Sequence, residues 1–221
     1  MGHRTSIATK KRKPQARGDA RRQELLNAAE TLLLSQEFDE VSMADIARQA
    51  EIPTASCYSL FSNSTAVFSQ LNNRYSQKFV ATLSSAVRDR DFSSWMEIMD
   101  YCCDFMVDFY EQHPSFSRIM LSGKAPSEVR YSRGRIDGSQ HAQQLLEFIS
   151  SRFSLPVIED PLTKFTVTVD LIDGIVASGF IREGRISETV LSEAKRAVQA
   201  YLKLYIPTFL PRNNMPRKNT Q

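Results

Sequence analysis

The sequence has few of the residues that build disulfides and metal sites. Its 221 residues include three cysteines and three histidines. An odd number of cysteines, two of them adjacent, does not make a disulfide framework, so we expect a reducing, cytoplasmic location. The histidines have no ligand spacing with one another or with the cysteines, so we expect no metal site and no cofactor. These residues are Cys57, Cys102, Cys103, His3, His113 and His141.

Long apolar runs and catalytic motifs are also missing. No uninterrupted apolar stretch is long enough to span a bilayer, and no apolar N-terminal segment suits a secretion signal, so we expect no membrane partner. No glycine-rich phosphate loop, His-Glu-x-x-His pair or nucleophile–base arrangement is present, which predicts that the protein is not an enzyme. With 42% hydrophobic and 24% charged residues, the chain has the composition of one or two ordinary globular domains.

What the sequence does have is helical periodicity along most of its length. Strand-like alternation occurs only in Phe165–Val169, whose Thr-Val-Thr-Val favours β-structure but lies between helical flanks. We therefore predict an all-α fold. Asp19 is expected to cap the first helix, and Lys124–Gly138 to be a loop or a frayed helix start. The predicted helices cover residues 19–37, 42–50, 54–60, 64–88, 93–112, 116–122, 140–153, 162–182 and 187–206.

Residues 41–61 have the pattern of two short helices joined by a tight turn. Ser42 and Asp45 form a Ser-x-x-Asp capping box at the start of the first helix. Glu51-Ile52-Pro53 ends that helix, and Thr54–Leu60 begins the second. Such a pair suits a helix-turn-helix, in which the second helix enters the DNA major groove. An ordinary helical hairpin is the alternative.

The charge of the chain is concentrated at its N-terminus. Eight basic residues against one acid give the first 22 residues a formal charge of +7, whereas the whole chain carries +3, so the other 199 residues carry −4. A basic arm just before a helix-turn-helix indicates a DNA ligand, and a solvated tail is the alternative. Because Thr54–Phe61 contains no Lys or Arg, phosphate neutralisation has to come from elsewhere. The basic residues are Arg4, Lys10, Lys11, Arg12, Lys13, Arg17, Arg21 and Arg22.

The last two predicted helices carry apolar faces lined with small residues. Gly174 and Gly179 lie inside a helix, where glycine costs about 1 kcal/mol relative to alanine, so another backbone is expected close by. This favours a homodimer interface, because two-fold dimers read two DNA half-sites; internal packing is the alternative. The predicted interface residues are Leu171, Ile175, Gly179, Ala194, Val198 and Tyr201.

Three motifs in residues 19–71 together identify a family. They are Arg22-x-x-Leu25-Leu26-x-Ala28-Ala29, Phe38-Asp39-x-Val41-Ser42-Met43-x-Asp45-Ile46-Ala47-x-x-Ala50 and Ile52-Pro53-Thr54-x-Ser56-x-Tyr58-x-x-Phe61. On these motifs the chain resembles the TetR family of bacterial transcriptional regulators. The resemblance implies an all-helical dimer, an N-terminal helix-turn-helix domain and a larger C-terminal domain for effector binding and dimerisation.

The resemblance also implies roles for single residues. Thr54, Ala55 and Ser56 would face base edges, Tyr58 would hydrogen-bond a phosphate, and Ser42 would contact the DNA backbone. The predicted DNA-binding residues are Ser42, Thr54, Ala55, Ser56, Tyr58, Ser59, Ser64, Arg17 and Arg21.

The chain departs from the family pattern at four positions near the predicted DNA surface. Glu51 and Glu37 stand where glycine is usual, Ser64 where a phosphate-contacting lysine is usual, and Pro53 where a capping serine is common. We therefore expect the basic arm to supply the missing positive charge.

An effector pocket in the C-terminal domain is a further implication of the resemblance. Aromatic and methionine side chains in residues 95–120 suit an apolar or aromatic molecule, with plain core packing as the alternative. Cys57 is expected to be a small buried residue, with an oxidation-sensitive thiol as the alternative. The pocket candidates are Trp95, Met99, Phe105, Phe109, Phe116 and Met120.

Together these features predict a dimeric, sequence-specific transcriptional regulator that binds a palindromic DNA operator. Repression relieved by a small-molecule effector is the expected mode. The alternative is an architectural or non-specific DNA-binding protein that relies on the basic arm. The predicted domains are a basic disordered arm (1–18), a helix-turn-helix domain (19–65), an effector-binding and dimerisation domain (66–206) and a C-terminal tail (207–221).

Overall fold

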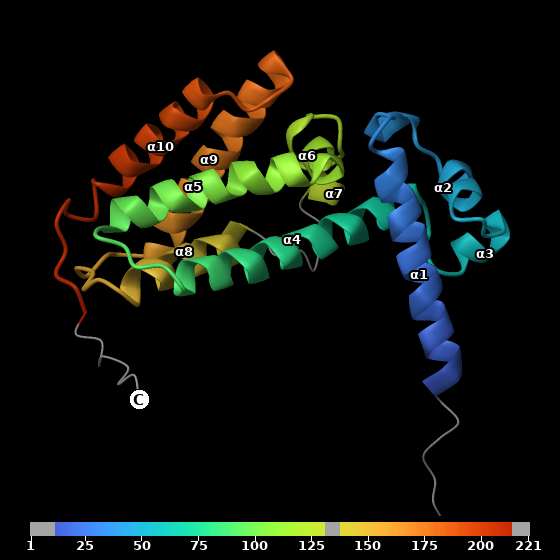
Figure 1. Ribbon diagram of the computed structural model, residues 1–221, viewed down its shortest axis with the longest axis horizontal. Coiled ribbons are helices and arrows are strands. Elements are labelled where there is room, and N and C mark those ends of the chain that lie inside the picture. The colour runs from blue at the N-terminus through green and yellow to red at the C-terminus, as the bar shows by residue number, and fades with distance from the viewer. Residues whose placement is uncertain (1–11, 131–137, 214–221) are drawn as a thin grey trace, which may run out of the picture. The chain divides into compact units, whose positions relative to one another are not determined.

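The computed structural model describes residues 12–130 and 138–213, and within them it contains ten α-helices, one 3-10 helix and no strand (Figure 1). The prediction of an all-α fold is confirmed. The chain divides into two compact units, Met1–Leu71 and Asn72–Gln221. None of the helices in the described part is long and apolar enough to cross a membrane.

The N-terminal unit consists of α1 (Arg12–Leu32), a 3-10 turn η1 (Phe38–Glu40), α2 (Met43–Gln49), α3 (Thr54–Tyr58) and the first turns of α4 (Ser64–Arg88). The unit ends at Leu71 rather than at the predicted residue 65, because the first two turns of α4 contribute to its core. The Phe68 ring lies 4.5 Å from the Phe38 ring, measured between centroids. The buried core includes Leu25, Leu26, Ala29, Leu33, Phe38, Val41, Ile46, Ala47, Cys57, Phe61, Val67, Phe68 and Leu71.

The first helix begins at Arg12, so the predicted start at Asp19 is wrong and residues 12–18 are not disordered. Most residues of this stretch are good helix formers. Pro14 lies in the first turn, where a backbone N–H has no intrahelical partner to lose. The remainder of the predicted basic arm, residues 1–11, lies outside the described residues.

The C-terminal unit contains the rest of α4 together with α5 (Trp95–Gln112), α6 (Pro114–Leu121), α7 (Ser127–Arg130), α8 (Gly138–Ser150), α9 (Pro161–Glu183) and α10 (Glu188–Leu202). Helix α9 is central, since it packs against α6, α8 and α10, and α10 also packs against α5 (Figure 1). The β-favouring stretch of α9 is helical as predicted. There the Thr166 and Thr168 hydroxyls donate to main-chain carbonyls one turn earlier, Leu162 and Lys164.

Helix α7 lies in the segment predicted to be a loop or a frayed helix start. Val129 is fully buried, and its carbonyl accepts a 2.8 Å hydrogen bond from the Asn72 side chain of α4. A helix of four residues is not stable alone. Contacts with residues far away in the sequence therefore hold it, and local patterns do not reveal such contacts.

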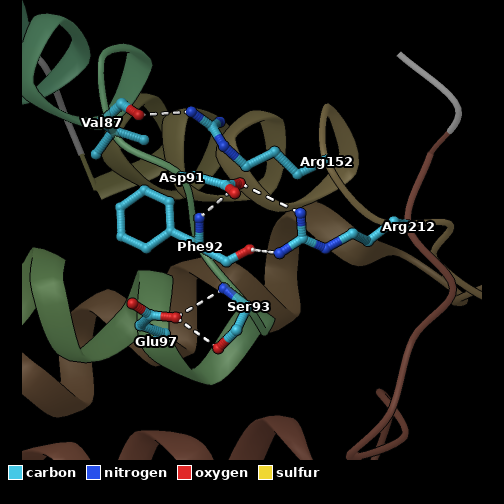
Figure 2. A network of polar contacts seen from close by, with 7 residues as sticks. All are labelled: Val87, Asp91, Phe92, Ser93, Glu97, Arg152 and Arg212. Carbon is cyan, nitrogen blue, oxygen red and sulfur yellow. Dashed lines mark hydrogen bonds and ion pairs between the residues drawn. The ribbon is translucent and has the colours of Figure 1, made fainter. Parts of the chain in front are cut away.

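The predicted tail is ordered by polar contacts as far as Asn213. Arg212 donates to the Phe92 carbonyl at 2.6 Å and to the Asp91 carboxylate at 3.3 Å (Figure 2). Arg152 donates to the Val87 carbonyl at the end of α4 at 2.5 Å. These two arginines connect the α4–α5 junction to the end of α8 and to the C-terminal segment.

Candidate DNA-binding surface and internal cavity

The turn between α2 and α3 is closed by a glutamate in a left-handed conformation. Glu51 has φ +56°, its N–H donates to the Arg48 carbonyl, and the Ile52 N–H donates to the Ala47 carbonyl. This hydrogen-bond pattern is a Schellman motif, which usually places glycine at the left-handed position. The family glycine is therefore replaced without loss of the turn, at the cost of some backbone strain.

Helix α3 presents small and hydroxylated side chains to solvent. Thr54, Ala55 and Tyr58 are exposed, with 55% of the Tyr58 side chain accessible, while Ser56 is half-buried. Cys57 is fully buried and fixes the opposite side of the helix in the core. Burial raises the pKa of the Cys57 thiol, which disfavours the reactive thiolate and supports the interpretation of a small core residue.

Two of the predicted DNA-contacting serines use their hydroxyls inside the protein. Ser42 accepts from the Asp45 N–H at 3.2 Å, and both its hydroxyl and its own N–H donate to the Asp45 carboxylate. The predicted capping box is thus present, but a phosphate contact by the donors of Ser42 would have to compete with it. The Ser59 hydroxyl donates to the Ser56 carbonyl at 2.7 Å.

Exposed basic side chains of the same unit lie on α1. Arg17 and Arg21 are exposed and lie four residues apart, so they project from the same side of the helix. Arg22 instead lies over the Phe61 ring, 5.3 Å from its centroid, and packs within the unit. Ser64 is half-buried at the first residue of α4, where the nearby Asn63 side chain caps the helix by accepting from the Ala66 N–H.

The C-terminal unit contains a partly open cavity lined by α4, α5, α6, α8 and α9. It offers about 70 Å³ to the centres of water-sized molecules. Three predicted pocket residues line it, namely Phe109, Phe116 and Met120. Among the residues that the structure describes, the cavity is lined by Ser76, Phe79, Leu83, Cys102, Cys103, Met106, Phe109, Tyr110, Phe116, Met120, His141, Gln144, Leu145, Val169, Ile172 and Asp173.

The other three predicted pocket residues do not line the cavity. Trp95 and Met99 are fully buried elsewhere in the core, and the Trp95 indole N–H donates to the Pro207 carbonyl at 2.8 Å. Phe105 is half-buried and contacts the lining residue Phe79, with 5.8 Å between the two ring centroids. All three have the helical spacing of the true lining residues, so periodicity alone does not distinguish a cavity wall from the core.

Sequence reasoning missed the lining residues of α4, α8 and α9. Ser76, Phe79 and Leu83 follow the spacing of an apolar helix face, which identifies a buried face but not a cavity. His141 and Asp173 come from different helices. No local signal in the sequence shows that these two polar residues line the same cavity.

Three of the predicted dimer-interface residues are buried inside the chain instead. A Cβ atom on Gly179 would lie 2.6 Å from Cγ1 of Val190, so the small residue allows α10 to pack closely on α9 of the same chain. Ala194 and Val198 are also buried in the subunit. The prediction that these three face a partner is corrected, because internal packing uses them.

Another face of α9 and α10 remains open to solvent. Leu171 and Ile175 are half-buried, Ile181 is 60% exposed, and a Cβ atom on Gly174 would meet nothing within 4 Å. The outward residues of α10 include Tyr201, which is half-buried. This outward face consists of Leu171, Gly174, Ile175, Ile181 and Tyr201.

Comparison with known proteins relates both units to one fold. A family model for the tetracyclin repressor-like C-terminal domain matches residues 93–206. A TetR-family transcriptional regulator from Streptomyces coelicolor is 20% identical with a TM-score of 0.67, over 84% of this chain and 99% of that chain. A TetR transcriptional regulator from Rhodococcus sp. RHA1 is 18% identical with a TM-score of 0.60, over 85% and 97% of the two chains.

A third structure has a ligand. RolR, crystallised in complex with resorcinol, is 16% identical with a TM-score of 0.62, over 84% of this chain and 89% of that chain. At these identities the structures show a shared fold. No curated protein sequence matches the chain.

Proposed function

The chain belongs to the TetR family of transcriptional regulators, and from this premise we propose that it is a homodimeric repressor that binds a palindromic operator and is released by a small molecule. The N-terminal unit, residues 1–71, is the DNA-binding part. The C-terminal unit, residues 72–221, provides dimerisation and the effector site.

The observation that carries the proposal is the arrangement of α2 and α3. A capped helix, a closed Schellman turn and a buried Cys57 hold α3 with Thr54, Ala55 and Ser56 facing outward or partly outward. Hydroxyl and methyl groups of this kind contact base edges in the major groove. Arg17 and Arg21 would supply the phosphate contacts that α3 lacks.

We infer that the subunits associate through the outward face of α9 and α10. Leu171, Gly174 and Ile181 lie on one side of α9, and large exposed apolar side chains rimmed by polar residues mark interaction surfaces. An isologous two-fold contact between these faces would give the dimer two recognition helices, one for each half-site of a palindrome.

We further infer that the effector occupies the cavity of the C-terminal unit. The cavity is lined mainly by apolar side chains with a few polar groups, which is the usual composition of a small-molecule site. The resorcinol complex of RolR supports this inference, since that protein shares the fold and binds a small aromatic molecule. Because α4 contributes both to the cavity and to the N-terminal unit, a shift of α4 on ligand binding would alter DNA binding.

Selection of bound sequences from random double-stranded DNA tests the proposal. A dimeric regulator enriches a palindrome with half-sites centred about one helical turn apart. An architectural protein that relies on the basic arm binds random duplexes about as well as any enriched sequence. Light scattering on the same preparation should give the mass of a dimer, and a monomer that binds its operator with full affinity would contradict the proposed assembly.

A further inference from the structure

We propose that α3 recognises a T·A base pair in each half-site through the C5-methyl group of thymine, which packs against the side chain of Ala55. The proposal rests on the proposed function, in which α3 enters the major groove, and names the base chemistry that this helix recognises. Three features of α3 carry it: the side that faces outward, the residue types on that side, and the hydrogen bond that one of its hydroxyls already makes.

The buried Cys57 determines which side of α3 faces outward. Successive residues of an α-helix are turned by about 100°, so Ala55 and Ser59 each lie about 160° from Cys57. Cys57 has no exposed surface, whereas Ala55 and Ser59 are exposed. In a helix-turn-helix the N-terminal residues of the second helix contact base edges, and Ala55 is the second residue of α3. Ala55 is therefore the side chain of α3 that points most directly at the bases.

The residue types of α3 leave out the side chains that bind guanine and adenine most strongly. Arg and Lys bind the O6 and N7 acceptors of guanine, and Asn and Gln bind adenine with two hydrogen bonds. Residues 54–59 are Thr, Ala, Ser, Cys, Tyr and Ser, so none of these four types is present. Ala55 offers a methyl group alone, and the group on a base edge that matches it is the thymine methyl.

The hydroxyl on the same side of α3 acts toward DNA as an acceptor. The Ser59 hydroxyl donates its proton to the Ser56 carbonyl at 2.7 Å. Ser59 follows Ala55 by four residues, so the two side chains are neighbours on the helix surface. The Ser59 oxygen can accept from the amino group of adenine or cytosine, but it offers no proton to the acceptors of guanine.

A T·A pair matches both of these outward groups. Its thymine carries the methyl group that suits Ala55, and its adenine carries the amino donor that suits Ser59. Cytosine also has an amino donor, but its C5 atom carries a hydrogen in place of the methyl group. The contact between the two methyl groups is therefore what distinguishes thymine from cytosine at this position.

Removing single methyl groups from the operator tests the proposal. In the palindrome selected by the full chain, each thymine is replaced in turn by deoxyuridine, which pairs as thymine does but has no C5-methyl group. At the position facing Ala55, the loss of one buried methyl should weaken binding about fourfold in one half-site and about 15-fold when both half-sites are changed. Thymines outside the contact with α3 serve as internal controls. Fluorescence anisotropy at one fixed salt concentration measures the affinities.

A second base change separates the methyl group from the rest of the base pair. A C·G pair at the same position should bind more weakly than T·A. 5-Methylcytosine at that position should regain about fourfold per half-site relative to cytosine, because the two bases have the same hydrogen-bonding groups and differ in the methyl alone.

Removing the methyl group from the protein tests the same contact from the other side. In Ala55→Gly the affinity ratio between thymine and uridine should fall toward one, since each protein is compared with itself on two DNAs and a less stable α3 cancels. Thr54→Ser is the matched control. It removes a methyl from an exposed residue that lies about 60° from Cys57, at the flank of α3, and it keeps the hydroxyl. This variant should retain the full ratio.

Three results would overturn the proposal: no thymine whose methyl affects binding, a folded Ala55→Gly protein with an undiminished ratio, or loss of the ratio in Thr54→Ser. The deoxyuridine series on the unmodified chain stays decisive if Ala55→Gly fails to fold. A chain that selects a palindrome but tolerates uridine at every position refutes the methyl contact alone. A chain that selects no palindrome refutes the proposed regulator, and the methyl contact with it.

Discussion

The side chains proposed to read DNA lie at the surface of the N-terminal unit, whereas the cavity proposed for the effector lies inside the C-terminal unit. In α3 the side chains that would read DNA are outward, and the buried Cys57 only positions them. In the C-terminal unit, residues of five helices line the cavity. The residues of an exposed site on one helix lie close together in the sequence, so one short motif is enough to recognise them. The residues that line a cavity are far apart in the sequence, so no single motif identifies them.

The largest expected effect tests the close packing inside the C-terminal unit. Gly179→Leu should destabilise the protein by about 1–3 kcal/mol or more, because its Cβ atom alone would lie 2.6 Å from the Val190 side chain. Gly174→Ala is the control, since its Cβ atom meets nothing, and should stabilise by up to about 1 kcal/mol. Urea unfolding measures both. An undiminished stability of Gly179→Leu would place Gly179 against a partner rather than against Val190.

The second prediction concerns the charge of the N-terminal surface. Replacing both Arg17 and Arg21 with Gln should lower the log–log salt dependence of DNA binding by roughly 0.9 for each phosphate that is no longer neutralised. The decrease in affinity should be greatest at low salt and equal for operator and random DNA, because neither arginine is expected to touch a base. Gel-shift titrations over a range of salt concentrations measure this slope. An unchanged slope would show that neither arginine contacts a phosphate and that other residues supply the attraction to DNA.

Removal of the α2 cap is expected to cost about 1 kcal/mol. Ser42→Ala deletes the hydroxyl that accepts from the Asp45 N–H. Hydrogen bonds from Ser42 hold the pKa of the Asp45 carboxyl below its ordinary value of 3.8. A lowered pKa in the folded state means that this stabilisation is present above the ordinary pKa and is lost as the pH falls through the lowered value.

Two measurements check this cap. NMR titration should show the Asp45 pKa rising toward its ordinary value in Ser42→Ala, and the stability difference between variant and parent should shrink at low pH. If the loss of DNA affinity exceeds the loss of stability near neutral pH, Ser42 binds DNA as well as capping the helix.

Two substitutions in α3 distinguish a phosphate contact from a contact with a base. Tyr58→Phe removes one exposed hydroxyl and should weaken binding to all sequences by about 0.5–1.5 kcal/mol. Ser56→Ala should instead change which base is preferred. Quantitative selection on both variants decides between the roles. The roles assigned to Tyr58 and Ser56 would both be wrong if Tyr58→Phe altered the preferred sequence and Ser56→Ala weakened binding to every site equally.

The smallest expected effect is a gain in the stability of the folded protein. Glu51→Gly relieves a left-handed conformation that costs a non-glycine residue about 1–2 kcal/mol, but glycine loses about 0.5–1 kcal/mol of chain entropy. The net stabilisation should be below about 1 kcal/mol by thermal unfolding. Removing the carboxylate should also raise DNA affinity, most clearly at low salt. Lower stability of the variant would show that the Glu51 side chain makes a compensating contact.

Local chemistry makes much of the N-terminal unit predictable. The capping box of Ser42 and Asp45 and the turn around Glu51 depend on residues within a few positions of one another, and both are present. The predicted start of α1 at Asp19 is wrong, because a plausible cap competes with a run of good helix formers. In the C-terminal unit the other helices are predicted, but α7 is not, since it depends on the contact between Asn72 and Val129.

The sequence by itself determined most of the helices and the family. Periodicity of 3.6 residues and short capping motifs are properties of neighbouring residues, and the family motifs lie within residues 19–71. Only the tertiary structure decided which small and aromatic residues face which partner. Gly179 and Gly174 look alike in the sequence, yet one packs on Val190 and the other faces open space. Phe109 lines the cavity and Phe105 does not, because the neighbouring helices, rather than the residue or its spacing, determine what each side of a helix meets.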